Sequence, residues 1–196
     1  MTLQQNNILA LFEQTGAYLK GHFRLTSGLH SPEYMQCALV LKVPTHAETL
    51  GRALAAKLQE LTAGRSIGLV VSPAMGGIII GHEVARALGV PAIFTERENG
   101  AMTFRRGFHV EPGTTVVVIE DVVTTGGSTR EVIALLKAMG AQVLAAGSII
   151  DRSGGKADVG VPRAALHTMQ VTVWPPDQCP LCAQGLPVVK PGSRAV

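Results

Sequence analysis

The chain has 196 residues, of which 46% are hydrophobic and 4% aromatic, and its formal net charge is +3. It is long enough for one sizeable domain with an aliphatic core, but it has no basic stripe and no apolar stretch of membrane-spanning length, so we expect neither a nucleic-acid partner nor a membrane span. Its N-terminus lacks the features of a signal peptide and its three cysteines form no secreted disulfide framework, so we expect a cytoplasmic protein.

The first third of the chain predicts two helices and two extended segments between them. Apolar residues at 8, 9, 11 and 12 indicate a short amphipathic helix that ends near Gly16. Two extended segments, 22–28 and 31–41, follow with a turn between them. Thr45 and Glu48 form a capping-box pattern after Pro44, and the helix that it opens carries on one face Leu50, Leu54, Leu58 and Leu61.

The rest of the chain alternates strand-like and helix-like patterns. The pattern predicts strands at 66–72, 92–95, 116–123, 142–150 and 166–174, and helices at 78–88 and 128–139. Ser128 and Glu131 form a second capping-box pattern at the start of the latter helix. Residues 96–113 are polar and predict a long mobile loop or a flexible hairpin, and the proline-rich end is expected to be irregular.

This alternation predicts an α/β fold with a central, mainly parallel sheet and helices on both faces. Ligands of such sheets lie beyond the carboxyl ends of the strands. We therefore expect one cleft to be formed by the loops at 73–77, 96–113, 120–128 and 151–155. No internal repeat or interdomain linker is evident, so a single domain is expected over 1–196.

The segment Val116–Ser128, VVVIEDVVTTGGS, carries most of the recognisable chemistry. Its small-residue loop can donate backbone N–H and hydroxyl groups to a phosphate, and the dipole of the following helix favours an anion there. Glu120 and Asp121 would repel a phosphate, so they fit ribose hydroxyls or the Mg²⁺ that accompanies a diphosphate. The alternative is an ordinary buried strand that ends in a turn and an N-cap.

This segment resembles the 5-phosphoribosyl-1-diphosphate (PRPP) signature of the type I phosphoribosyltransferases. Over residues 3–194 the chain resembles the orotate branch of that family in FRLTSGLHSPEY (23–34), PAMGG (73–77), FRRGF (104–108), DRSGG (151–155) and the tail at 190–194. The resemblance implies transfer of phosphoribosyl from PRPP to orotate with Mg²⁺ as cofactor, which gives orotidine 5′-monophosphate and diphosphate for UMP synthesis.

The resemblance also implies an architecture. The core of the type I fold would span about 43–160, and a small hood would be built from about 1–42 with the C-terminal segment. It further implies a homodimer in which loop 96–113 contributes to the neighbouring active site.

Roles for single residues follow from the same resemblance. PRPP would bind to Arg97 and to the run Glu120, Asp121, Val122, Val123, Thr124, Thr125, Gly126, Gly127 and Ser128. Orotate would bind to Thr124, Arg152 and Thr26, although many relatives have Lys at the position of Thr26. The planar fork of Arg152 suits a carboxylate, and the alternative is a surface ion pair with Asp151. No direct metal ligand is assigned, but Mg²⁺ held through PRPP could also contact Glu120 and Asp121.

Departure of diphosphate from the ribose is helped by positive charge on the leaving group. Many relatives carry a catalytic Lys in the mobile loop, whereas this chain has no Lys between residues 57 and 137. We predict that Arg105 or Arg106 takes that role when the loop closes, and we include Asp121 among the catalytic candidates. Arginine donates no proton at neutral pH, so a proton would come from His109 or solvent. The alternative is a hairpin with two solvated arginines.

Cys179 and Cys182 form a C-x-x-C pair, which is half of a structural zinc site. The sequence leaves open whether this pair binds zinc, acts in redox chemistry or only orders a turn. No metal-ligand spacing is evident for the histidines, which are expected to be structural: His22, His30, His46, His82 and His167.

Two other functions fit the PRPP signature. One is a phosphoribosyltransferase for another base, and the other is a PRPP-sensing regulator with the same fold. About forty residues precede the first core helix, too few for a DNA-binding domain in addition to the hood.

Overall fold

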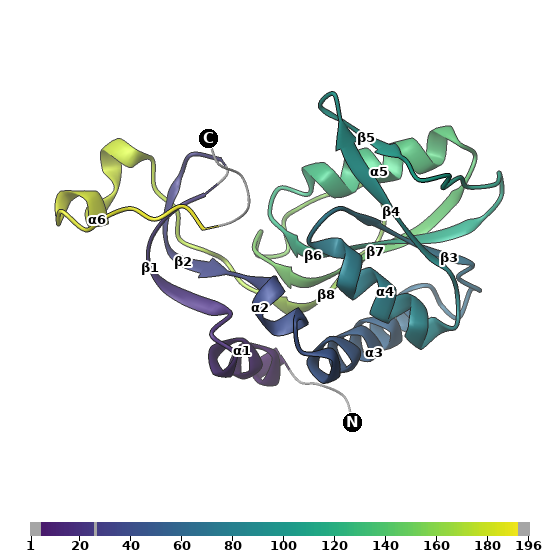
Figure 1. Cartoon of the computed structure of the whole chain (residues 1–196), viewed down its shortest axis with the longest axis horizontal. Helices are drawn as coiled ribbons and strands as arrows, with labels where there is room; N and C mark the ends of the chain where they lie inside the picture. The colour runs from purple at the N-terminus through teal and green to yellow at the C-terminus, as the bar shows by residue number, and fades with distance from the viewer. Residues whose placement is uncertain (1–4, 26, 192–196) are drawn as a thin grey trace.

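The computed structural model describes residues 5–25 and 27–191 and contains a six-stranded sheet in the order β5-β4-β3-β6-β7-β8 (Figure 1). Neighbouring strands pair in parallel except β4 and β5, which are antiparallel. The strands are β3 (Leu69–Pro73), β4 (Ala92–Glu98), β5 (Ala101–Phe104), β6 (Thr115–Val123), β7 (Gln142–Asp151) and β8 (Arg163–Thr168). The predicted α/β class with a mainly parallel sheet is confirmed.

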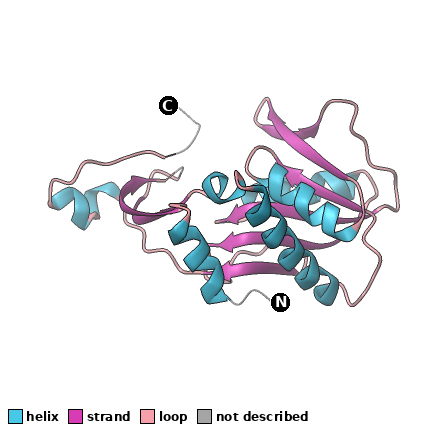
Figure 2. Cartoon of the chain, turned by 60° about the horizontal axis from the view of Figure 1, so that its bottom comes forward, coloured by secondary structure: helices cyan, strands magenta, loops and turns pink. Residues whose placement is uncertain are grey.

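Helices cover both faces of the sheet, and alternate strand residues belong to separate hydrophobic clusters. Val117 and Ile119 pack into the cluster formed with α1 (Gln5–Gln14), α2 (Cys37–Leu41), α3 (Pro44–Leu61) and α4 (Gly77–Leu88). Val116 and Val118 pack against α5 (Gly127–Ala138) on the opposite face. This alternation follows from the two-residue period of a strand, and Figure 2 shows the sheet strands with helices in front of them.

The helix starts differ from the predicted capping boxes. The N-caps of α3 and α5 are Val43 and Gly126, and neither makes a side-chain capping bond. At α3, Pro44 occupies the first turn, where its missing N–H needs no partner. At α5, Glu131 forms an ion pair with Arg97 at 3.0 Å instead of turning back to the helix start. Both predicted capping boxes are therefore wrong.

The predicted apolar face of α3 and the predicted extended segment at 31–41 were both too long. On α3, three of the four leucines are fully buried, but Leu61 in the last turn is 38% exposed. The extended segment predicted for 31–41 ends at Met35, because 37–41 forms α2 and buries Cys37, Val40 and Leu41. A short apolar run fits a buried strand and a buried helix equally well, so packing decides between them.

The polar segment at 96–113 is a hairpin over its first part, one of the two predicted forms. Strand β4 continues to Glu98, and β5 returns antiparallel to it from Ala101. The strand expected at 166–174 is wrong in its bounds, because β8 covers only Arg163–Thr168.

A small two-stranded sheet lies beside the large one and carries the end of the chain. Strands β1 (Tyr18–Arg24) and β2 (His30–Met35) form an antiparallel hairpin. The C-terminal tail, with η1 (Pro176–Gln178) and α6 (Pro180–Ala183), pairs with that hairpin through Phe23–Val189 and His30–Trp174 bridges. Figure 1 shows α6 next to β1 and β2, away from β4 and β5. Within residues 5–25 and 27–191, no helix is long and apolar enough to cross a membrane.

Candidate functional site

A cavity of about 430 Å³ lies between the carboxyl ends of the central strands and the β1–β2 hairpin. From the large sheet and the loops after β6 and β7 it is lined by Asp121, Val122, Thr124, Thr125 and Arg152. The hairpin, the chain that follows β2 and the C-terminal tail supply the other lining residues, namely Leu25, Ser27, Leu29, Tyr34, Met35, Gln36, Val171 and Val173. The cavity is therefore shared by segments from both ends and the middle of the chain.

The parallel register of β6 and β7 brings two of the predicted loops together. Val123 pairs with Asp151, and the backbone N–H of Arg152 donates to the Val123 carbonyl at 2.8 Å. The loop after β3 also reaches this edge, because a Cβ at residue 76 would lie 2.5 Å from an oxygen of the Asp121 carboxyl. Only glycine leaves room for that approach. The predicted convergence is confirmed for these three loops, and the fourth loop is described below.

Glu120 and Asp121 lie on opposite faces of β6, as the alternation of a strand requires. Glu120 accepts a hydrogen bond from Thr129 of α5, whereas Asp121 lies against Gly76 at the start of α4. Burial raises the pKa of Glu120 to about 7, and burial also raises the pKa of Asp121. Within the described chain neither carboxyl has a cationic partner within 4 Å. This donor set fits a hard cation or sugar hydroxyls.

The loop between β6 and α5 leaves its backbone donors available. No hydrogen bond within the described residues uses the N–H groups of Thr124, Thr125 and Gly126. Gly126 has φ +75°, and a Cβ there would meet Val159 at 2.8 Å. Arg130 holds the loop from outside by donating to the Thr125 carbonyl at 2.8 Å. These N–H groups stand at a helix N-terminus, where an anion is stabilised.

Arg152 lies in the cavity, and no acidic side chain of residues 5–25 and 27–191 forms an ion pair with it. Its predicted alternative partner, Asp151, pairs instead with Arg163 at 2.8 Å and accepts hydrogen bonds from Ser153. The interpretation of Arg152 as half of a surface ion pair is therefore wrong. Burial lowers the pKa of Arg152, while Tyr34 nearby has a pKa that burial raises. A half-buried guanidinium of this kind attracts a carboxylate from a ligand.

The arginines predicted to be catalytic, on the hairpin at 96–113, do not line this cavity. Arg106 makes two hydrogen bonds to Glu96, at 2.9 and 3.0 Å, and Arg105 lies 3.7 Å from Glu98. Arg97 pairs with Glu131 of α5. No residue of 96–113 lines the cavity. The expectation that this loop forms the cleft within its own chain is therefore not met, and the arginines sit on the hairpin among acidic partners.

The remaining predicted residues fall beside the cavity or outside the description. Residues that do not line the cavity but lie next to it in the chain are Glu120 and Val123 at the end of β6, Gly126 in the loop, and Gly127 and Ser128 in the first turn of α5. Thr26 lies outside the described residues. Sequence reasoning did not single out the cavity residues of the hairpin and the tail, although Leu25, Ser27, Leu29 and Tyr34 all lie in the motif at 23–34. Nothing local marked Val171 or Val173.

The fold and this strand–loop–helix site define a phosphate-binding transferase class. The model of the phosphoribosyl transferase domain matches residues 43–176, so the chain belongs to the phosphoribosyltransferase family. A relative from Pelotomaculum thermopropionicum, named orotate phosphoribosyltransferase, is 55% identical over 194 residues, which are 99% of this chain and 100% of the relative. A protein of the same name from Thermotoga maritima is 51% identical over 189 residues, covering 96% of this chain and 99% of that protein.

A solved structure agrees with these relatives. The crystal structure of orotate phosphoribosyltransferase from Aeropyrum pernix matches with a TM-score of 0.65 and 28% identity over 82% of this chain and 93% of that chain. Within the family, the chain is thus placed among the orotate phosphoribosyltransferases, and the resemblance seen in the sequence is confirmed.

Proposed function

We propose that the cavity holds PRPP and orotate together and joins them. The bond from C1 of the ribose to the diphosphate oxygen would break, a bond from C1 to a ring nitrogen of orotate would form, and the proton of that nitrogen would pass to solvent. Orotidine 5′-monophosphate and diphosphate would leave. The observation that carries this proposal is the position of Arg152, whose guanidinium has no acidic partner among the residues that the structure describes, in the same cavity as the loop residues Thr124 and Thr125.

Each part of the cavity then has a role. The N-terminus of α5 and the N–H groups at 124–128 would hold the 5-phosphate, while Arg152 and Thr124 would hold the carboxylate and the ring of orotate. Asp121, which lines the cavity, would face the ribose hydroxyls, and Glu120 would act from the other face of the strand end, beside the loop. The hairpin and the tail would form the hood over the base. The division into this hood and a core at about 43–160 stays a prediction, as does a cytoplasmic location.

Mg²⁺ is the cofactor that the acidic pair fits. Both carboxyls are buried enough to raise their pKa values and lack cationic partners within the described chain, so an incoming cation would offset their charge. The ion would supply positive charge near the departing diphosphate. The protein's part would be to hold one carboxyl on each face of the strand end, Glu120 through its hydrogen bond from Thr129 and Asp121 through its fit against Gly76.

The loop arginines would act in a second copy of the chain. The hairpin at 96–113 contributes nothing to its own cavity, and Arg105 and Arg106 lie at the exposed surface on acidic residues of the same hairpin. In a homodimer, these two arginines could leave their acids, and Arg97 could leave Glu131 of α5, for the diphosphate in the neighbouring site. Such an exchange of ion pairs costs little at an exposed surface, where a salt bridge contributes about 0–1 kcal/mol.

The direct test follows the ultraviolet absorbance of orotate in the presence of PRPP and Mg²⁺. We expect absorbance loss with orotate and no product from adenine or uracil, which lack the carboxylate that Arg152 would bind. Turnover of another base without turnover of orotate would overturn the proposed acceptor. PRPP binding with no turnover of any base would instead indicate a sensor.

Replacement of Glu120 tests the acidic pair through pH. Because burial raises the pKa of Glu120 to about 7, the wild-type KM for PRPP should rise as pH falls from 8 to 6, by about tenfold per pH unit below 7. In the folded protein the raised pKa favours the protonated form, so its contribution to stability is present at low pH and is lost as pH rises through 7. Glu120→Gln should therefore melt above the wild type at pH 8 and bind PRPP more weakly.

The control for that experiment is Glu60→Gln, because Glu60 is exposed on α3, away from the cavity and the loop, and forms no ion pair within the described chain. Calorimetry with PRPP and thermal melting at pH 5 and pH 8 measure both effects. Equal PRPP affinity in Glu120→Gln and wild type at pH 8 would contradict a role for Glu120 in binding.

A further inference from the structure

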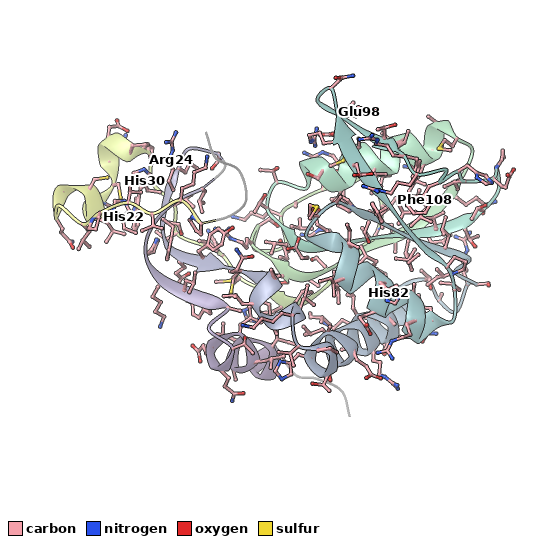
Figure 3. All side chains as sticks on the ribbon, viewed as in Figure 1. His22, Arg24, His30, His82, Glu98 and Phe108 are labelled. Atoms are coloured by element: carbon pink, nitrogen blue, oxygen red, sulfur yellow. The ribbon has the colours of Figure 1, made fainter. Side chains whose placement is uncertain are left out.

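Four side chains that bind transition metals meet outside the cavity, where the β1–β2 hairpin contacts the tail. Nitrogen atoms of His22 and His30 and the sulfur atoms of Cys179 and Cys182 all lie within 4.8 Å of one another. Three of these residues are buried, and Cys182 is exposed. Figure 3 shows His22 and His30 beside the tail, at the end of the molecule away from Glu98 and Phe108.

The spacing of the four atoms is close to that of a tetrahedral zinc site. Bond lengths of about 2.0 Å to nitrogen and about 2.3 Å to sulfur put a nitrogen and a sulfur ligand about 3.5 Å apart. His22 Nε2 lies 3.5 Å from Cys179 Sγ and 3.6 Å from Cys182 Sγ, and His30 Nδ1 lies 3.3 Å from Cys182 Sγ. The two nitrogens are 2.8 Å apart, somewhat closer than the about 3.3 Å of a filled site.

The hydrogen bonding of His22 is also that expected of a histidine that binds a metal ion. Its other ring nitrogen, Nδ1, lies 2.8 Å from the carbonyl oxygen of Leu186, and a carbonyl can only accept. The proton therefore belongs on Nδ1, and Nε2 presents its lone pair to the cluster. Metal-ligating histidines are commonly oriented in this way by a partner on the second ring nitrogen.

The tail lacks the apolar packing that would otherwise hold it. Between residues 175 and 191, Cys179 is the only buried residue, and the large apolar side chains Leu186, Val188 and Val189 are 46%, 47% and 54% exposed. Backbone hydrogen bonds join Val189 to His22 and Arg24 at 2.8 Å each. Small units with so little core are commonly held by a metal or a disulfide.

We propose that His22, His30, Cys179 and Cys182 bind one Zn²⁺ that fastens the C-terminal tail to the β1–β2 hairpin. Two thiolates with two imidazoles select zinc over Mg²⁺, and four protein ligands leave no position for a substrate. The site is therefore structural and separate from any Mg²⁺ at the acidic pair. The sequence shows no metal-ligand spacing for His22 and His30, because only the pairing of the hairpin strands brings the two side chains close together.

The zinc site would also shape the cavity, a consequence that rests on the proposed function. Ser27 and Leu29, which precede His30 in the chain, line the cavity, and His30 bridges to Trp174, whose neighbour Val173 also lines it. Loss of the metal would loosen both of these segments. We therefore expect a larger rise in KM for orotate than fall in kcat.

Metal content is the first measurement, made on the full-length protein purified under reducing conditions without chelators. We expect about one zinc per chain in wild type and less than about a tenth of that in Cys182→Ser and His30→Gln. Cys37→Ser and His82→Gln are the matched controls and should keep their zinc, because both residues lie outside the cluster. Exchange for Co²⁺ should give the visible bands of tetrahedral thiolate coordination in wild type and the controls only.

Removal of zinc from the wild-type protein tests the proposal without variants, which could fail to fold. Chelation should lower Tm by about 5–10 °C, and added Zn²⁺ but not Mg²⁺ should restore it. The proposal is overturned if reduced wild-type protein takes up no more zinc or cobalt than Cys182→Ser, or if Cys179 and Cys182 form a disulfide in the protein as purified. An unchanged Tm on complete zinc removal would overturn the structural role. Metal content, Co²⁺ spectra and Tm do not depend on catalytic turnover. They therefore test the zinc site even if the proposed activity is not found.

Discussion

Replacement of Arg152 with alanine should lower kcat/KM for orotate by about 10²–10³-fold and leave the affinity for PRPP within a fewfold of wild type. Arg152 is half-buried in the cavity and has no acidic partner within the described chain. Its truncation would therefore leave the carboxylate of bound orotate unpaired in a partly dry site. The free-energy cost of leaving that buried charge unpaired exceeds the net contribution of the Arg152–carboxylate pair. We therefore expect Arg152→Ala to have the largest effect on substrate binding.

Two further variants sharpen the result for Arg152. Arg152→Lys keeps the charge but loses the planar fork, so its kcat/KM should fall between those of wild type and the alanine variant. Arg52→Ala removes an exposed arginine on α3 that pairs with Glu48, and it should behave as wild type. Steady-state kinetics with orotate and calorimetry with PRPP measure the two substrates separately. An alanine variant with normal kcat/KM for orotate would exclude Arg152 from the base site.

Replacement of Arg106 with alanine should lower kcat by about 10²–10³-fold with KM values for both substrates within a fewfold of wild type. The expected pattern follows from the proposal that the loop arginines contact the diphosphate as charge develops on it, because an interaction made chiefly in the transition state changes kcat more than KM. The same measurement on Arg105→Ala identifies which arginine acts. Equal, near-wild-type kcat in both variants and in the double variant would contradict the role of the loop.

A mixing experiment separates action within one chain from action between two. Subunits with Arg152→Ala have an intact loop, and subunits with both loop arginines replaced have an intact base site. If the loop acts in the neighbouring site, an equal mixture of exchanged subunits should recover about a quarter of wild-type activity, because half of the dimers are mixed and each has one complete site. No recovery in verified mixed dimers would place the loop on its own cavity.

Local patterns in the sequence determined the fold class and the phosphate-binding half of the site. Continuous apolar runs, small-residue loops and helical periodicity act over a few residues, so β6, the loop at 124–128 and α5 were predictable in order. The position of Arg152 directly after a core strand was equally local. Because parallel strands end at one edge, the meeting of these loops followed from the alternation of elements.

Tertiary structure decided what depends on partners distant in the chain. Packing against the helical face of the sheet made Cys37–Leu41 a helix, and Asp151 pairs with Arg163 instead of with its neighbour Arg152. Cys179 and His22, 157 residues apart, met only through the pairing of the tail with the hairpin. A sequence offers several chemically equivalent partners for each such group, and the register of strands and the fit of side chains select among them.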